Sequence, residues 1–239
     1  MKTLFAAAAI AAGLAAAGSA SATELLTNGN FDQGATGFYS QYVYSPPNGS
    51  GTNLYPEATY DVTTDAHADH PAFASFADHT GGAGGGMMMV INGSSTPDTI
   101  IWSEGDVGGG APLIGAANTE YTFSFWLASV YPASPADLQL WVNGAAVPGE
   151  TFAALGGDQA LGQWQAFTYT GVTGANGLQS ISLTNRNLEP NGNDFALDDM
   201  SLQGVAVPEP TSWALMLLGF GGLGALMRGH RRLAAIAAA

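Results

Sequence analysis

The 239-residue sequence contains no cysteine and very few basic residues. Without cysteine, the chain forms no disulfide bond and offers neither a thiol nucleophile nor a thiolate metal ligand. Residues 23–207 hold 18 Asp or Glu side chains against a single base, Arg186, which gives a formal charge of −17. Nucleic-acid binding needs Lys and Arg side chains that neutralise phosphates, so this composition excludes it.

The first 22 residues have the pattern of a secretory signal peptide. Lys2 supplies a positive charge, an Ala-rich apolar stretch follows, and Ala20-Ser21-Ala22 matches the small-x-small pattern that signal peptidase cleaves. We therefore expect residues 1–22 to be removed, so that the mature chain starts near Thr23 outside the cytoplasmic membrane. A buried Ala-rich helix is the alternative.

Residues 208–232 combine three elements in a fixed order: a Pro-Glu-Pro triplet, an apolar stretch over 213–227 and a cluster of arginines. The triplet and cluster comprise Pro208, Glu209, Pro210, Arg228, Arg231 and Arg232. The prolines exclude helix before the apolar stretch, which is near the short limit of the ~17–25 residues that span a bilayer. We expect a transmembrane helix after Pro210, with the arginines on the cytoplasmic side. An ordinary tail anchor is the alternative.

This order of elements resembles the PEP-CTERM sorting signal of bacterial surface proteins. Exosortases, membrane enzymes usually found beside exopolysaccharide genes, process that signal. The resemblance implies export, membrane anchoring before processing, and then a place at the cell surface or in the extracellular matrix. Its implied partners are the exosortase, the export machinery and the membrane. Residues 233–239 add an Ala-rich tail where the family normally stops.

Between the two ends, apolar and polar residues alternate as in strands with one buried face. In residues 120–130, the apolar odd positions alternate with Thr122, Ser124 and Trp126, and residues 137–142 repeat the pattern. Asn143-Gly144 then predicts a tight hairpin into residues 145–147. Further predicted strands are residues 38–44, 87–91, 99–102, 164–169, 178–184 and 195–202.

About eight short strands with no convincing amphipathic helix predict an all-β fold. We expect a single jelly-roll-like antiparallel β-sandwich over residues 23–202, a linker over 203–207, and no internal domain break.

Two segments resemble the edges of galactose-binding-like sandwiches, which include several carbohydrate-binding modules. The sequence LLTNGNFD at 25–32 is similar to their opening motif, and GNDFALDDMSL at 192–202 is similar to their closing strand. In those modules the first and last strands often meet and share a structural calcium ion. Asp32 stands where the family more often has Glu, which shortens one implied ligand.

Asp32, Asp198 and Asp199 are therefore the candidate calcium ligands, with backbone carbonyls completing the shell. Asp198 shares its strand parity with Ala196, and in one interpretation its side chain points into the protein interior. A buried carboxylate needs a partner, and Arg186 is the only base in the domain. A solvated strand end with a turn aspartate is the alternative.

The sequence carries no recognised catalytic motif. It has no Gly-x-Ser-x-Gly elbow, and the glycines at 81–86 lack the lysine of a P-loop. His67, His70 and His79 lie near Asp69 and Asp78, a set that suits zinc; without a helix to align them, a polar surface loop is the favoured interpretation. Glycosidase carboxylate pairs stay open, because 18 acids offer many pairings.

Trp126 and Trp141 lie opposite the apolar faces of their strands and are candidate sugar platforms. If their strands share a sheet, the two indoles share a face. The alternative is that loops or strands cover them, since Trp is usually well buried. Four more aromatics cluster early in the chain, at Tyr39, Tyr42, Tyr44 and Tyr55. The shortage of Lys and Arg favours a neutral or cationic glycan.

These observations predict a non-enzymatic, exported surface or biofilm-matrix protein that is sorted through its PEP-CTERM signal. The alternative is a carbohydrate-binding module that recognises exopolysaccharide, and a third hypothesis is a hydrolase with an unrecognised site.

Overall fold

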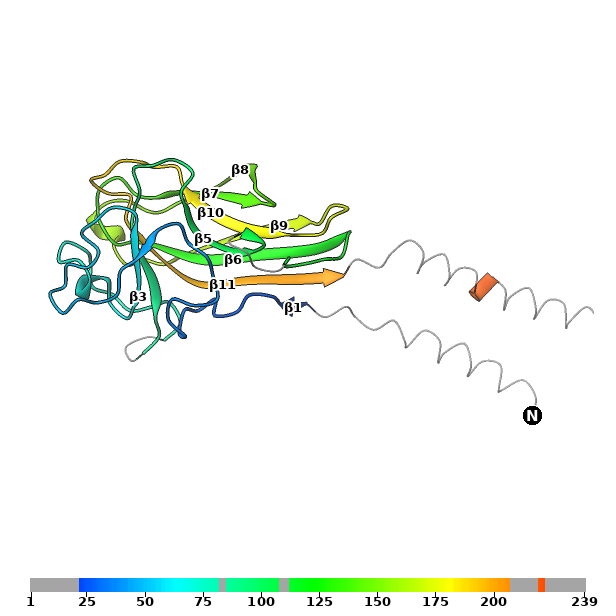
Figure 1. Cartoon of the computed structure of the whole chain (residues 1–239), viewed down its shortest axis with the longest axis horizontal. Coiled ribbons are helices and arrows are strands. Elements are labelled where there is room, and N and C mark those ends of the chain that lie inside the picture. Colours follow the sequence, from blue (N-terminus) through cyan, green and yellow to red (C-terminus); the bar gives the residue numbers. More distant parts are fainter. Residues whose placement is uncertain (1–21, 82–84, 108–111, 207–218, 222–239) are drawn as a thin grey trace, which may run out of the picture. The chain divides into compact units, whose positions relative to one another are not determined.

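The computed structural model describes residues 22–81, 85–107, 112–206 and 219–221 of the chain. Contacts divide the chain into two compact units, residues 1–205 and 206–239. The described part of the first unit consists of two sheets packed face to face (Figure 1). This architecture confirms the all-β sandwich that the alternating pattern predicts.

In chain order the elements of the sandwich are β1 (Thr23–Glu24), β2 (Val43–Tyr44), β3 (Thr59–Thr63), the 3-10 helix η1 (Ala66–Ala68), β4 (Met88–Asn92), β5 (Ile100–Gly105), β6 (Thr119–Ser129), β7 (Asp137–Val142), β8 (Ala145–Ala153), the 3-10 helix η3 (Asp158–Ala160), β9 (Gln165–Val172), β10 (Ser180–Asn185) and β11 (Phe195–Ala206). The strands differ in length from two residues in β1 and β2 to 11 in β6 and 12 in β11.

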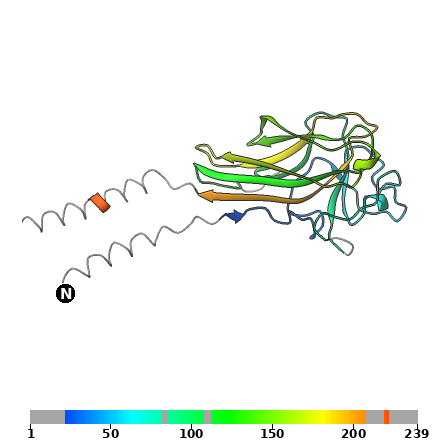
Figure 2. The ribbon, with the colours of Figure 1, turned by 180° about the vertical axis from the view of Figure 1, so that it is seen from behind.

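One sheet has seven strands and the other has four. The larger has the order β2-β3-β4-β11-β6-β9, with β1 also pairing to β11, and the smaller has the order β5-β10-β7-β8. β2 and β3 run parallel, an exception to the antiparallel arrangement expected from the sequence. Seen from both sides, β7, β8 and β10 form one layer and β6 and β11 the other (Figures 1 and 2).

The predicted alternation of β6 is confirmed. Tyr121, Phe123, Phe125 and Leu127 are buried in the core between the sheets, whereas Trp126 on the opposite side is only half-buried. The ring of Trp102 on β5 stacks on Phe123 at a centroid distance of 5.8 Å and therefore joins the two sheets.

The predicted hairpin at Asn143-Gly144 is also present, between β7 and β8. Val142 pairs with Ala145, and both turn residues have positive φ, 51° and 74°. Positive φ at both positions is what a type I′ turn requires, and Asn followed by Gly adopts it at low cost.

Strand β4 is buried on both faces, which explains its unbroken apolar sequence. Met89 and Ile91 face the core between the sheets, whereas Met88 and Val90 belong to a second cluster on the outer face of the larger sheet. Ala66 of η1, together with Leu54 before it and Phe73 after it, covers that outer face.

Strand β11 changes its parity at Asp198-Asp199. Phe195 and Leu197 face the core before this point, and Met200 and Leu202 face it afterwards, so one residue is inserted. Asp199 has a positive φ of 46°, as at a β-bulge. Asp198 is therefore fully buried, but away from the core between the sheets.

The expected linker over 203–207 is wrong for most of its length, because β11 continues through Ala206. Gln203 and Gly204 pair with Glu24 and Thr23 of β1, so the first and last strands of the sandwich meet. The predicted strand over 38–44 is likewise reduced to β2 and a single bridge between Tyr39 and Ser103.

We predict that Trp102→Ala destabilises the domain severely. Its side chain is 1% exposed and contacts both sheets, so truncation leaves a large cavity and lowers the free energy of unfolding by about 3–5 kcal/mol. Urea unfolding followed by tryptophan fluorescence and circular dichroism measures the loss. Val172→Ala, at a position 61% exposed, is the control and should change little; equal losses in both variants would contradict the role of Trp102.

Candidate functional site

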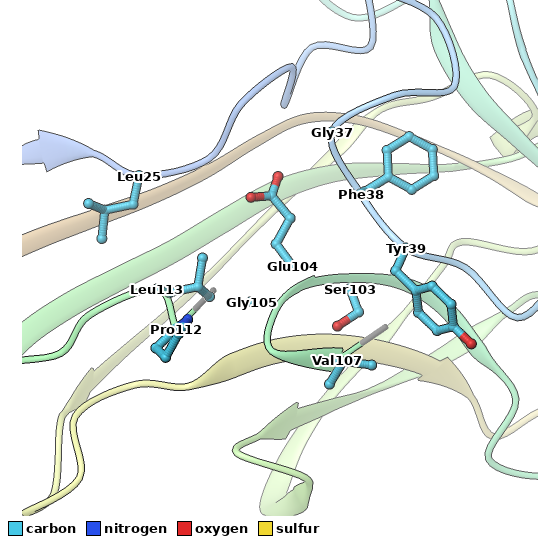
Figure 3. A pocket seen from close by; sticks show the side chains of 10 residues that line it. All are labelled: Leu25, Gly37, Phe38, Tyr39, Ser103, Glu104, Gly105, Val107, Pro112 and Leu113. Atoms are coloured by element: carbon cyan, nitrogen blue, oxygen red, sulfur yellow. The ribbon is translucent and has the colours of Figure 1, made fainter. Parts of the chain in front are cut away.

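A cavity of about 500 Å³ lies where the segment after β1 passes the end of β5 (Figure 3). This volume is within the usual range of small-ligand sites. Leu25 and Leu113 give it apolar walls, and Tyr39 and Glu104 supply polar atoms. Ser103 also lines it but is fully buried, and its hydroxyl donates to the Ile181 carbonyl at 3.0 Å. The Glu104 side chain extends from β5 toward the segment that holds residues 37–39 (Figure 3).

The backbone fixes the shape of this cavity. Tyr39 and Ser103 exchange two backbone hydrogen bonds, of 2.8 and 2.9 Å, which attach residues 37–39 to β5. Gly37 and Gly105 have φ of +87° and +103°, and a Cβ at either position would overlap a backbone carbonyl oxygen. Both positions therefore require glycine.

Glu104 is the most perturbed group in the cavity. It is 9% exposed, and burial raises its pKa from 4.5 to about 7, although a hydrogen bond from the Thr27 backbone opposes the rise. The nearby charge of Glu24 adds to the increase in pKa. At neutral pH the carboxyl group can therefore both accept and donate hydrogen bonds.

No cation balances Glu104 within the described residues. Arg186, the only Lys or Arg between residues 3 and 227, forms its ion pair with Asp137 at 3.1 Å. The cavity therefore combines a carboxyl group, a hydroxyl group and an aromatic ring without positive charge. This chemistry suits a neutral ligand rich in hydroxyl groups. Sequence analysis did not single out Glu104, whose only signal was an acid within the apolar strand β5.

A second cavity, of about 250 Å³, lies among the loops beside η1. Tyr55, His70 and Tyr131 line it together with Glu57 and Asp194. Burial raises the pKa of Asp194 to about 7, against a hydrogen bond from a backbone amide, and burial also raises the pKa of Glu57. Two acids in one cavity are the arrangement that the hydrolase hypothesis requires.

The three predicted calcium ligands already accept hydrogen bonds from the protein. Asp32 binds the Met87 amide at 3.0 Å. Asp198 binds the backbone amides of His79 and Asp199, both at 2.7 Å, and Asp199 contacts the His79 ring at 2.5 Å. Asp198 does not pair with Arg186, which lies on Asp137 instead.

Among the residues that the structure describes, no three His, Asp or Glu side chains converge as metal ligands. Calcium at Asp32, Asp198 and Asp199 stays a prediction. Burial raises the pKa of Asp198 to about 7, the two amides oppose this, and the neighbouring charges of Asp199 and Asp78 reinforce it.

Trp126 and Trp141 do not share a face, because β6 and β7 belong to different sheets and the condition for a shared face is not met. The His79 ring stacks on Trp126 at a centroid distance of 3.6 Å, which covers one face of that indole. The Trp141 ring donates a hydrogen bond to Thr184 at 2.9 Å. Alternation along a strand shows which face each residue occupies, but it does not show which sheet the strand belongs to. The sequence therefore could not predict that the two tryptophans lie on different sheets. Sugar binding by either indole stays a prediction.

The three clustered histidines have separate partners in the described structure. His67 forms a hydrogen bond through Nδ1 to the Phe73 carbonyl at 2.8 Å. His70 packs against the rings of Tyr55 and Phe73, and His79 is held by Trp126 and Asp199. The imidazoles therefore contribute to loop packing, and they do not form a shared site.

The predicted sorting residues, Pro208, Glu209, Pro210, Arg228, Arg231 and Arg232, lie outside the described residues, as does the signal peptide up to residue 21. Within the described part of the chain, no helix is long and apolar enough to cross a membrane. The predicted transmembrane helix falls almost wholly on residues outside that part.

We predict that Glu104→Gln changes how stability depends on pH. Because the folded state raises the pKa of Glu104 from 4.5 to about 7, it binds this proton more tightly than the unfolded state does. The contribution of this group to stability therefore falls as pH rises through that interval, by up to about 3 kcal/mol. Urea unfolding across the interval should show a smaller decline in the variant. Glu189→Gln, on the surface, should leave the decline unchanged.

The comparisons with solved structures return β-sandwich proteins of low identity. The C-terminal domain of EclA, a sugar-binding protein, is 14% identical with a TM-score of 0.34, over 43% of this chain and 66% of that chain. The CBM22-1 xylan-binding domain of Paenibacillus barcinonensis Xyn10C is 15% identical with a TM-score of 0.46, over 80% and 100%. A Stig cyclase from Fischerella sp. TAU is 12% identical with a TM-score of 0.47, over 78% and 100%.

The chain spans about two thirds of the EclA chain that it resembles. No curated protein matches the sequence. The model of the PEP-CTERM protein-sorting motif matches residues 206–232. The resemblance inferred from the triplet, the apolar stretch and the arginines is therefore confirmed, and the chain carries a PEP-CTERM motif that marks it for export and sorting to the cell surface.

Proposed function

We propose that the exported β-sandwich is a non-catalytic carbohydrate-binding domain that holds a neutral polysaccharide in the cavity beside β5. The observation that carries this proposal is the cavity itself, which is lined both by Tyr39, 38% exposed, and by the perturbed carboxyl group of Glu104. The exposed ring offers a flat apolar surface for the C–H face of a sugar. The carboxyl group of Glu104 supplies hydrogen-bonding atoms for its hydroxyl groups.

The charge of the domain supports a neutral ligand. An acidic polysaccharide would meet a formal charge of −17 with one base, and that base already pairs with Asp137. Long-range repulsion would slow the association of an acidic polysaccharide with the domain, and the buried carboxyl group of Glu104 would disfavour its binding in the cavity. In a bacterium that secretes exopolysaccharide, a sorted protein of this kind would join the matrix to the cell surface.

The hydrolase hypothesis has one observation in its favour, the pair of Glu57 and Asp194 in the second cavity. Asp194 is 7% exposed and accepts a hydrogen bond from the Gly93 amide at 3.0 Å, so it has a structural role already. Screening the protein for release of reducing sugar from polysaccharides tests this alternative. Release that is lost in Glu57→Gln would overturn the non-catalytic assignment.

We predict that Tyr39→Ala abolishes retention of the protein in affinity gels that contain the bound polysaccharide. The stacking surface is lost, while the backbone bridge to Ser103 does not depend on the side chain. We expect affinity to fall at least tenfold with little change in the melting temperature. Glu104→Gln should weaken retention less, because it keeps the shape of the side chain.

Two other tyrosines serve as controls for this experiment. Tyr44, 45% exposed, lies outside both cavities, and Tyr44→Ala should bind as the wild type does. Tyr55, 53% exposed, lines the second cavity. Loss of retention in Tyr55→Ala together with normal retention in Tyr39→Ala would move the binding site to the second cavity.

We also propose that an exosortase recognises residues 206–232 and removes the end of the chain. We predict that protein extracted from the surface of the native host lacks residues 228–232 in intact-mass analysis. The double variant Pro208→Ala, Glu209→Ala should keep the full tail and remain in the cytoplasmic membrane fraction. Recovery of the full tail from wild-type cells would indicate a simple anchor instead.

A further inference from the structure

Two buried aspartates face each other at the start of the larger sheet. Asp61 on β3 and Asp69, which follows η1, are both 0% exposed. Burial raises the pKa of Asp61 to about 7, and the charge of Asp69 raises it further. Burial also raises the pKa of Asp69, although the nearby side chains of Asn53 and Thr63 oppose the rise. Two carboxylates in one buried place therefore need a proton or a cation to offset their charge.

No basic side chain in the described residues supplies such a cation. Arg186 is paired with Asp137, and no other Lys or Arg lies between residues 3 and 227. Burial raises the pKa of Tyr44, and the nearby charges of Asp61 and Asp69 raise it further.

Three buried oxygen atoms at this place accept no hydrogen bond. They are both carboxylate oxygens of Asp69 and the side-chain oxygen of Asn53, a residue 5% exposed. The Asn53 amide nitrogen donates to the Ser45 carbonyl at 2.7 Å and to Asp61 at 3.4 Å. The atom of this side chain without a hydrogen-bond partner is therefore its oxygen. One proton shared by the carboxylates would satisfy only one of the three oxygens, and each remaining one carries a desolvation cost.

We propose that Asp61, Asp69 and the side-chain oxygen of Asn53 bind a calcium ion. Calcium prefers carboxylate and amide oxygens, and its two positive charges equal the charge of the two carboxylates. The ligand set contains no nitrogen or sulfur, so it does not suit the softer transition metals.

The ion would join three segments that otherwise have few links. Asp61 belongs to β3, Asp69 follows η1, and Asn53 lies in the loop that Ser45 holds through two hydrogen bonds of 2.7 Å. These segments also supply part of the second apolar cluster, which covers the outer face of the larger sheet. Calcium would therefore stabilise this cover.

This site is separate from the one predicted at Asp32, Asp198 and Asp199. Both oxygens of Asp198 accept backbone amide hydrogen bonds, so Asp198 has its partners without an ion. Asp69 has none for either oxygen. The oxygens without hydrogen-bond partners therefore favour calcium binding at Asp61, Asp69 and Asn53, the β3 site.

Calcium binding to the full-length protein in mild detergent tests the proposal. After dialysis against EGTA, isothermal titration with calcium gives the number of ions and their affinity, and thermal melts give the stabilisation. We expect Asp69→Asn to lose one ion relative to the wild type, or to bind it at least tenfold more weakly. In EGTA this variant should melt at or above the wild-type temperature, because one of two like charges is gone.

Asp194→Asn is the matched control, since it removes a carboxylate that is also buried, at 7% exposed, but belongs to neither calcium site, and it should leave calcium binding unchanged. If Asp69→Asn lacks the wild-type circular dichroism spectrum, Asp61→Asn replaces it with the same expected loss. A wild type that binds no calcium, or an Asp69 variant with unchanged stoichiometry and affinity, would overturn the proposal. A purely structural role for Asp69 would lower the melting temperature in EGTA and leave calcium binding unchanged.

Discussion

The buried carboxylate of Asp198 joins the central strand of the larger sheet to the segment that covers it. It accepts the amide of His79, which belongs to that segment, and the amide of Asp199, which forms the bulge. The bulge reverses the parity of β11, so that Met200 and Leu202 point into the core between the sheets. Without it, the second half of β11 would place these apolar side chains on the outside.

Acidic residues without counter-charges are the second constraint on this domain. Burial raises the pKa of Asp61, Asp69, Glu104, Asp194 and Asp198, and one base serves the whole domain. Asp194 and Asp198 are partly compensated by backbone amides, whereas neither carboxylate oxygen of Asp69 accepts a hydrogen bond of normal geometry from the described residues. Because these acids bind protons more tightly in the folded state than in the unfolded state, the stability of the fold depends on pH.

The sequence predicts most of what depends on local alternation and fails where distant segments meet. The faces of β6 and β7 and the turn at Asn143-Gly144 follow from neighbouring residues, and the structure confirms them. The hydrogen bond between Asp198 and His79 joins residues more than 100 positions apart, and composition carries no signal for it. The pairing of β1 with β11 is equally distant in sequence, and only the resemblance to galactose-binding-like sandwiches indicated it. For the same reason the sequence predicts which face of its strand Trp126 or Trp141 occupies, but not which of the two sheets that strand joins. The sequence does not predict a role for Glu104, because a single acid within an apolar strand forms no recognisable motif. Its role depends on the cavity beside it, which only the structure shows.

The walls of the cavity belong to different sheets, and this bears on how it would bind. The Leu25 amide donates to Leu202 of β11 in the larger sheet, whereas Tyr39 is bridged to Ser103 of β5 in the smaller one. A ligand between them would contact both sheets at once, so its site is as rigid as the packing of the sandwich. Glycine at 37 and 105 keeps the backbone in a conformation that other residues would strain. Because few of its residues would have to become ordered on binding, such a site would lose little affinity to conformational entropy. A small set of weak contacts with a neutral sugar could then be enough for binding.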